Sequence, residues 1–126
     1  MSGFTYLRRP PSRFVLALVC SPLTLSPALA ETAPGRLDCA REREGLRSEI
    51  SDQSTAIRFV NESGADKIVY WLNFDGLRVF YARLAPGEGY DQQTFVTHPW
   101  VVTSDSYGTC EALFTPAAVP TVAQLR

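Results

Sequence analysis

From residue 55 to residue 115 the chain alternates short apolar runs with turn residues, which is the pattern of β-strands joined by tight turns. The runs are rich in β-branched and aromatic residues, which favour strands. Asp75-Gly76 separates two runs and is a strong hairpin signal. The sequence therefore predicts an all-β domain over 55–115, a small antiparallel β-sandwich or barrel of six strands. The expected strands are 55–61, 67–74, 77–84, 89–96, 100–104 and 109–115.

The strand expected at 67–74 carries large apolar side chains on both faces, because successive residues of a strand point to opposite sides. One face would hold Ile68, Tyr70, Leu72 and Phe74, and we expect it to face the core. The opposite face would hold Val69, Trp71 and Asn73. A large indole on that face needs a covering segment or a ligand. Trp71 is therefore a candidate binding residue.

The segments that flank the predicted domain have weaker patterns. Residues 38–50 are the one stretch that favours a helix, with Asp38 placed to cap it, but Gly45 interrupts the stretch and its apolar face is thin. We therefore expect a short helix or an irregular arm within 31–54. No amphipathic pattern follows Pro116, so residues 116–126 are expected to be a loose tail.

The first thirty residues have the form of a secretory signal peptide. Three arginines flank the start of a short apolar run at 14–20, and Ala28-Leu29-Ala30 has the A-x-A form of a cleavage site. The run is too short to span a bilayer. Cleavage would leave residues 31–126 as a secreted or periplasmic protein without a membrane attachment. The alternatives are a disordered N-terminal tail and a lipoprotein signal that ends at Cys20.

Removal of residues 1–30 would also remove one of the three cysteines and leave Cys39 and Cys110. An even pair of cysteines in an exported chain favours a disulfide. In the chain-entropy model, closing so long a loop contributes about 4 kcal/mol to stability. The alternative is two separate buried thiols.

Charge and composition argue against several classes of function. Residues 31–126 contain nine basic and thirteen acidic residues with no basic stripe, which argues against nucleic acid as the partner. His98 is the only histidine, so a His-rich metal site cannot form. The chain has no Gly-rich phosphate loop and no G-x-S-x-G motif. We therefore expect no metal, no cofactor and no enzyme activity; a hydrolase with an unrecognised site is the alternative.

Three short blocks carry a resemblance to a known family: WLNFDG at 71–76, the L-x-P-G-x-G turn at 84–89 and H-x-W at 98–100. With Tyr81 between the first two, they resemble the β domain of the von Hippel–Lindau tumour-suppressor family, and the spacings match without gaps. The likeness fades to a general pattern over 55–70 and 101–115. It implies a small antiparallel β-sandwich.

In that family the β domain binds an extended peptide by enclosing a 4-hydroxyproline. The ligand-contacting positions fall here on Trp71, Tyr81, Gln93, Thr94, His98 and Trp100. By this resemblance the three aromatic residues form the pocket wall, the threonine and the histidine hold the hydroxyl, and the glutamine offers its backbone carbonyl. A hydroxyl and an imidazole can satisfy one buried alcohol. Plain proline would leave them unpaired at a cost of about 1–3 kcal/mol, which is a preference of roughly 5- to 150-fold.

The chain also departs from the family pattern. Thr94 replaces a serine and adds a methyl group, and Gln93 replaces a histidine. Pro99 removes a backbone donor, so its strand is expected at a sheet edge or at a bulge. Eleven residues follow Thr115, which leaves no room for the family's helical elongin-binding domain. We therefore expect no elongin-type ligase assembly.

Two hypotheses about function follow. The first is an exported binding module that holds an extended peptide containing proline or hydroxyproline. The second is a structural or protein-interaction domain that kept the fold without a working pocket. In the second, the tryptophans and the tyrosine only pack the sandwich.

Overall fold

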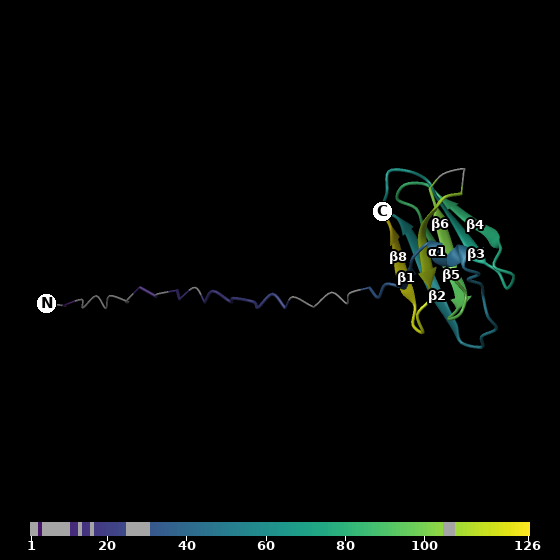
Figure 1. Ribbon diagram of the computed structural model, residues 1–126. Helices are drawn as coiled ribbons and strands as arrows, with labels where there is room; N and C mark the ends of the chain where they lie inside the picture. Colours follow the sequence, from purple (N-terminus) through teal and green to yellow (C-terminus); the bar gives the residue numbers. More distant parts are fainter. Residues whose placement is uncertain (1–2, 4–10, 13, 16, 25–30, 105–107) are drawn as a thin grey trace.

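The computed structural model describes residues 3, 11–12, 14–15, 17–24, 31–104 and 108–126. Two β-sheets pack face to face into one sandwich, with one short helix outside it (Figure 1). The predicted all-β sandwich is confirmed. Its elements are β1 (Gly35–Leu37), α1 (Ala40–Arg43), β2 (Ser54–Asn61), β3 (Lys67–Leu72), β4 (Arg78–Leu84), β5 (Gly89–Phe95), β6 (Trp100–Thr103), β7 (Cys110–Thr115) and β8 (Thr121–Leu125).

The larger sheet has the strand order β1-β7-β6-β3-β4, and the smaller sheet has the order β5-β2-β8. All neighbouring strands are antiparallel except β2 and β8, which are parallel. The turn between β4 and β5 carries the chain from one sheet to the other. One side of the sandwich is therefore formed by the edge strands β4 and β5, and the opposite side by β1 and β8.

The C-terminal segment is a strand, so the expectation of a loose tail over 116–126 was wrong. β8 pairs with β2 along its whole length and closes one edge of the smaller sheet. Its inward residues Thr121, Ala123 and Leu125 are buried, and they alternate with more exposed residues. Threonine and alanine gave the segment too weak an apolar signal for the strand period to be recognised.

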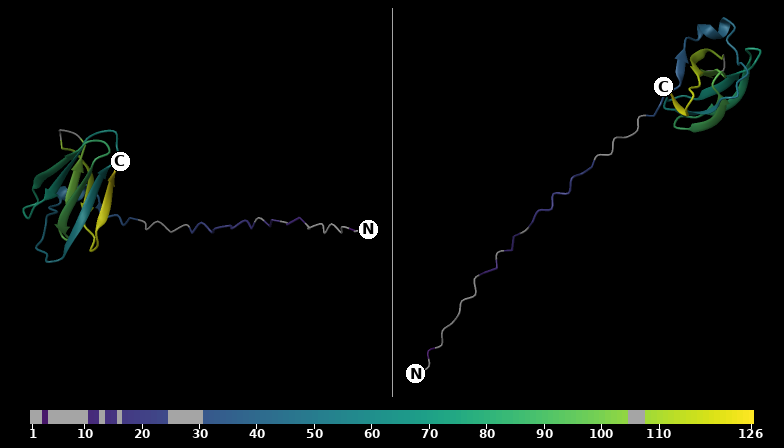
Figure 2. Two further views of the ribbon diagram at one scale, coloured as in Figure 1. Left: turned by 180° about the vertical axis from the view of Figure 1, so that it is seen from behind. Right: turned by 90° about the horizontal axis from the view of Figure 1, so that it is seen from below.

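The assignment of the core face of β3 was also wrong. Val69 faces the smaller sheet and is fully buried in the main core, with the half-buried Trp71 packed against it. The opposite face forms a second core around Leu72, which is covered by Leu37 and Leu46 from the N-terminal arm. The larger sheet is thus apolar on both faces, because the arm covers its outer side (Figure 2).

Pro99 does not mark an edge strand. It is fully buried just before β6, and β6 lies between β3 and β7 inside the sheet. The Pro99 carbonyl accepts a hydrogen bond from the backbone N–H of Leu72. Because the proline precedes the strand, its missing donor interrupts no ladder bond of β6. β6 does take part in a bulge, but this bulge lies in its pairing with β7, between Val102 and Thr103.

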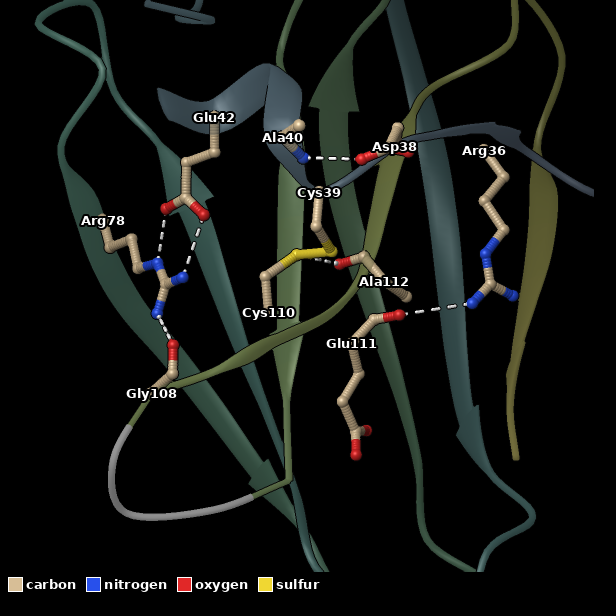
Figure 3. Close-up of a disulfide and its surroundings, with 10 residues drawn as sticks. All are labelled: Arg36, Asp38, Cys39, Ala40, Glu42, Arg78, Gly108, Cys110, Glu111 and Ala112. Atoms are coloured by element: carbon tan, nitrogen blue, oxygen red, sulfur yellow. Dashed lines mark hydrogen bonds and ion pairs between the residues drawn. A yellow bond between two sulfur atoms is a disulfide. The ribbon is translucent and has the colours of Figure 1, made fainter. Parts of the chain in front are cut away.

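The predicted disulfide is confirmed: Cys39 is bonded to Cys110 at the start of β7 (Figure 3). It fastens the arm to the larger sheet next to the second core. A bidentate ion pair adds a further attachment, because Arg78 of β4 donates to both carboxylate oxygens of Glu42 in α1 at 2.5 and 2.9 Å. The carboxylate of Asp38 accepts a bond from the N–H of Ala40 at the start of the helix.

Asn61 at the end of β2 is a fully buried polar residue whose side chain is saturated with hydrogen bonds. Its amide nitrogen donates to the carbonyls of Ala65 and Leu84 at 2.7 and 2.9 Å. Its oxygen accepts from the backbone N–H and the hydroxyl of Ser63. The side chain therefore ties the turn between β2 and β3 to the end of β4.

The segment assigned to a signal peptide is only partly described, and the cleavage site at 28–30 lies outside the described residues. Phe14, Val15, Leu18 and Val19 are each more than 80% exposed, so this part of the apolar run adds nothing to the core. Within the described part of the chain, no helix is long and apolar enough to cross a membrane.

Candidate binding site

Five of the six residues singled out from the sequence lie together near the open edges of β4 and β5. Trp71 of β3 and Trp100 of β6 are direct partners across the larger sheet, so their indoles project to the same face. Tyr81 comes from β4 and Thr94 from β5, and His98 comes from the turn between β5 and β6. Both sheets and one turn therefore contribute to the cluster.

The Tyr81 ring meets both tryptophan rings of this cluster edge to face. The centroid of the Tyr81 ring lies 4.9 Å from that of Trp100 and 6.4 Å from that of Trp71, and the interplanar angles are 81° and 82°. The centroid of the His98 ring lies 5.4 Å from that of Trp71, and the two rings are tilted by 34°. These distances are in the favourable range for aromatic pairs, so the rings stabilise one another's positions.

A β-bulge sets the direction of Tyr81. In the β3–β4 ladder Val69 faces Ala82 and Tyr70 faces Phe80, which leaves Tyr81 as the extra residue. A bulge adds one residue to one strand and changes which side chains share a face. Here it lets Tyr81 and Ala82 both contact the interior, Tyr81 on the tryptophans and Ala82 on the main core.

Thr94 is the buried polar residue of the cluster. The indole N–H of Trp100 donates to the Thr94 hydroxyl oxygen at 3.0 Å, and both residues are only 2% exposed. The hydroxyl hydrogen of Thr94 remains able to donate to a further acceptor. Thr55 stands directly opposite in the β2–β5 ladder, and its buried hydroxyl has no hydrogen-bond partner among the described residues.

Two residues that the sequence did not single out hold the site in place. Ser48 of the arm is buried, and its hydroxyl accepts the indole N–H of Trp71 at 2.8 Å while it donates to the Leu72 carbonyl. Phe74 contacts Trp71 at 5.6 Å and His98 at 5.4 Å. Phe74 stands in the WLNFDG block, but the strand pattern assigned it to the core.

The turn of that block explains the position of Phe74. β3 ends at Leu72, and the Asn73 side chain accepts the backbone N–H groups of Asp75 and Leu77. Gly76 has a φ of 75°, which other residues rarely adopt. The chain therefore reverses directly after Phe74, which leaves its ring 47% exposed beside His98.

Gln93 does not join the cluster through its side chain, which is exposed. The residue lies on the edge strand β5 opposite Ala56, and its side-chain amide donates to the backbone carbonyl of Thr94. Its neighbour Thr94 points inward, so strand alternation turns Gln93 outward.

His98 is held in a partly apolar environment. Its ring lies among those of Trp71, Phe74 and Phe95, and the loss of solvent lowers the pKa of the imidazole below its ordinary value of 6.5. A hydrogen bond to the backbone of Glu49 opposes this shift. At neutral pH the imidazole is therefore uncharged, with one donor and one acceptor nitrogen.

The depressed pKa of His98 gives a direct prediction. Because the chain has a single histidine, the ring C–H resonance in an NMR titration reports on this residue alone. We expect its midpoint below 6.5 in the folded protein and near 6.5 in denaturant. The unfolded chain then takes up the proton first, so stability should fall as the pH drops below 6.5. A folded-state midpoint at or above 6.5 would contradict this environment.

The described residues offer no metal site: nowhere among them do three or more His, Cys, Asp or Glu side chains gather closely enough to hold an ion. The cluster consists of aromatic faces, one hydroxyl and one neutral imidazole. Such a set can enclose a flat or ring-shaped group and hydrogen-bond a single polar atom on it.

A comparison with known families gives an independent result. The family model for the VHL beta domain matches residues 46–116, more than half of the chain. The chain belongs to the VHL β-domain family. The matched segment runs from the arm through β7 and includes the whole aromatic cluster. In this VHL β domain, β1, α1 and β8 lie outside the match.

Proposed function

We propose that this VHL β domain is a non-catalytic binding module that holds an extended peptide, and that its aromatic cluster receives a proline-type ring carrying a hydroxyl. The observation that carries the proposal is the convergence of Trp71, Tyr81, Thr94, His98 and Trp100 from four strands and a turn. The resemblance noted above assigns the hydroxyproline contacts of the family to these positions.

The exposed part of the cluster suits a proline-type ring. Tyr81 and Phe74 are 38% and 47% exposed beside the half-buried Trp71, so apolar aromatic surface is open to a partner. Flat aromatic faces bind a pyrrolidine ring through close contact and removal of apolar surface from water.

The adjoining strand edge suits an extended backbone. β4 is the last strand of its sheet, so one side of it carries backbone groups with no neighbouring strand. An extended peptide can add to such an edge through main-chain hydrogen bonds. Since Tyr81 lies on β4, a peptide along this edge would place its side chains next to the aromatic cluster.

Recognition of a hydroxyl requires one local movement. Thr94 is 2% exposed, and the Tyr81 ring packs on Trp100 next to it. A ligand hydroxyl therefore reaches the threonine only after a local movement. The Tyr81 side chain is the one that we expect to move, because it is partly exposed and sits on an edge strand. There, the ligand hydroxyl would accept a hydrogen bond from the Thr94 hydroxyl and form a second hydrogen bond with the His98 imidazole.

Matched peptides that differ only in proline or 4-hydroxyproline test the proposal by calorimetric titration. We expect the hydroxylated peptide to bind roughly 5- to 150-fold more tightly, the range set by about 1–3 kcal/mol for unpaired buried groups. His98→Leu should remove most of this difference, whereas Thr94→Ser, which keeps the hydroxyl, should preserve it. Val119→Ala is the matched control, because Val119 is an exposed apolar residue outside the cluster.

Equal binding of the two peptides would reject hydroxyl recognition. No measurable binding of either would reject the peptide module altogether. The second candidate, an interaction domain without a working pocket, is favoured by the close contact of Tyr81 with Trp100 and by the existing bond from Trp100 to Thr94. It predicts that Trp71→Ala lowers stability and leaves partner binding unchanged.

We also propose that the domain is exported to the cell exterior or the periplasm. A disulfide between Cys39 and Cys110 is typical of oxidising compartments. The exposed apolar run before residue 20 suits a signal segment that is removed. Export also separates the domain from elongin-type ligase assemblies, and its acidic charge balance disfavours nucleic acid as the partner.

A further inference from the structure

A cavity of about 590 Å³ opens at the side of the sandwich away from β4 and β5. It lies between β1 and β7 of the larger sheet and β8 of the smaller one, and none of the aromatic-cluster residues lines it. Its volume is within the usual range for small-molecule sites. Its apolar lining consists of Ala33, Pro34, Val102, Ala112, Phe114, Val122, Ala123 and Leu125.

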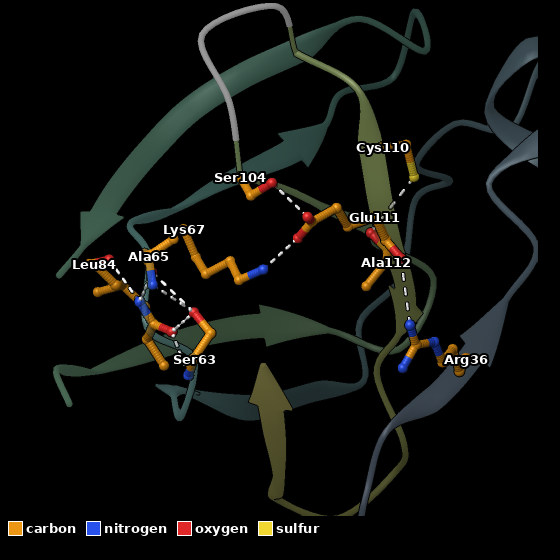
Figure 4. A network of polar contacts seen from close by, with 10 residues as sticks. Arg36, Ser63, Ala65, Lys67, Leu84, Ser104, Cys110, Glu111 and Ala112 are labelled. Carbon is orange, nitrogen blue, oxygen red and sulfur yellow. Dashed lines mark hydrogen bonds and ion pairs between the residues drawn. The ribbon is translucent and has the colours of Figure 1, made fainter. Parts of the chain in front are cut away.

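The polar lining of the cavity includes a buried lysine. Lys67 is the first residue of β3, and strand alternation points it into the sandwich on the same side as the core residue Val69. Its side chain is 6% exposed, and its Nζ forms an ion pair of 2.5 Å with a carboxylate oxygen of Glu111 (Figure 4). Lysine is almost never buried to this degree without a partner.

Glu111 is directed toward the lysine by the second bulge of the fold. In the β6–β7 ladder Val102 faces Ala112 and Thr103 faces Cys110, so Glu111 is the extra residue. Its other carboxylate oxygen accepts a bond from the hydroxyl of Ser104 (Figure 4). Bulges often re-aim side chains at functional sites.

The ammonium of Lys67 has unused hydrogen-bonding capacity. It carries three N–H donors, and Glu111 is the one acceptor that contacts it among the described residues. Buried donors are ordinarily satisfied by protein, water or ligand. Lys67 can therefore present donors to a group inside the cavity that it lines.

A second cation stands at the cavity wall. The guanidinium of Arg36 donates to the backbone carbonyl of Glu111 at 3.3 Å and lies 5.8 Å from the centre of the Phe114 ring. No carboxylate forms an ion pair with it within the described ranges. The cavity thus combines an apolar lining with three cations, Lys67, Arg36 and Arg126, and two carboxylates, Glu31 and Glu111. Lys67 pairs with Glu111 and Arg126 with Glu62, whereas Arg36 has no acidic partner among the described residues.

We propose that this cavity binds an organic carboxylate with an apolar body. The carboxylate accepts from Lys67 and Arg36, and the apolar body lies between β7 and β8 against Val102, Phe114 and Leu125. Glu111 competes for the ammonium and holds it in position when the cavity has no ligand. This inference is independent of the peptide site, because the two sites share no residue.

Calorimetric titration of the purified chain with octanoate, against 1-octanol as the neutral control, tests the proposal. We expect octanoate to bind at least about 10-fold more tightly than octanol, which is the effect of one hydrogen bond to a charged group. Lys67→Met keeps the side-chain volume and should remove that difference. Arg36→Gln changes only an exposed residue and should weaken octanoate several-fold.

Glu111→Gln gives the sharper test, since it removes the competing charge and keeps a partner for Ser104. Octanoate should bind this variant several-fold more tightly than it binds the parent. It should also raise the melting temperature of the variant by more than it raises that of the parent. Circular dichroism establishes that each variant is folded. Equal affinity for octanoate and octanol, or octanoate binding that neither Lys67→Met nor Arg36→Gln weakens, would overturn the proposal; so would no octanoate binding to the parent chain.

Discussion

Removal of residues 118–126 is expected to abolish cooperative folding of this domain. The deletion takes away β8, whose five residues pair with β2 and whose inward side chains are buried. The smaller sheet would shrink to the β5–β2 pair, and two-stranded sheets are marginal in water. Ile57 and Phe59, both fully buried, would lose their cover on that side.

The size of this effect follows from the side chains involved. Loss of one buried leucine side chain typically costs 2–5 kcal/mol, and the deletion also removes a whole ladder of backbone hydrogen bonds. A small domain has only about 5–15 kcal/mol of stability in total. We therefore expect the truncated chain to lose its dispersed NMR spectrum and its sigmoidal urea transition.

Two point variants in β8 separate the loss of buried side chains from the effect of shortening the chain. Leu125→Ala removes a residue that is 3% exposed and should cost about 2–5 kcal/mol. Gln124→Ala changes an exposed neighbour and should cost less than about 0.5 kcal/mol. A truncated chain that still unfolds cooperatively, within about 1 kcal/mol of the parent, would refute the structural role of β8.

Loss of the disulfide should be the second largest effect. Cys39 and Cys110 are 71 residues apart, and closing a loop of this length contributes about 4 kcal/mol in the chain-entropy model. The bond also fastens the arm over the outer face of the larger sheet. Without it, Leu72, Val101 and Leu113 depend on the arm's own packing for their cover.

Urea denaturation with and without a reductant measures this contribution. The double variant Cys39→Ala/Cys110→Ala should unfold at a lower urea concentration than the parent. Its free energy of unfolding should be about 2–5 kcal/mol smaller, and reductant should not change it further. Cys20→Ala is the control, because that thiol is free and exposed. A parent transition that does not respond to reductant would show that the bond adds nothing to stability.

The sequence predicted the fold class and brought attention to the five residues that lie together in the cluster, because those signals are local. Asp75-Gly76 between two strands strongly favours a hairpin, and β3 and β4 are indeed joined in that way. The blocks that contain Trp71 and Trp100 carried the family resemblance, and strand register then places the two indoles side by side. The cysteine pair also followed from an elementary count.

The errors arose where a segment distant in sequence decides the outcome. The outer face of β3 has the apolar pattern of a core face, because Leu37 and Leu46 of the arm cover it. No local pattern in β3 distinguishes that face from the one toward the smaller sheet. β8 was missed because Thr121 and Ala123 are small and weakly apolar, and their burial depends on pairing with β2.

The bulges at Tyr81 and Glu111 were beyond sequence reasoning for a related reason. A bulge is a property of the pairing between two strands, and single-strand periodicity does not contain it. Ser48 was missed because its role is to accept the indole N–H of Trp71, which lies 23 residues away. Its own neighbourhood is a polar arm without a strand or helix period.

The saturated side chain of Asn61 has a consequence for modification of the protein. Asn61-Glu62-Ser63 has the N-x-S form of an N-glycosylation acceptor. A sugar on the amide nitrogen would displace a hydrogen that is donated to a buried carbonyl, and it would need space where the side chain has none. The folded domain therefore has no room for an oligosaccharide at this triplet.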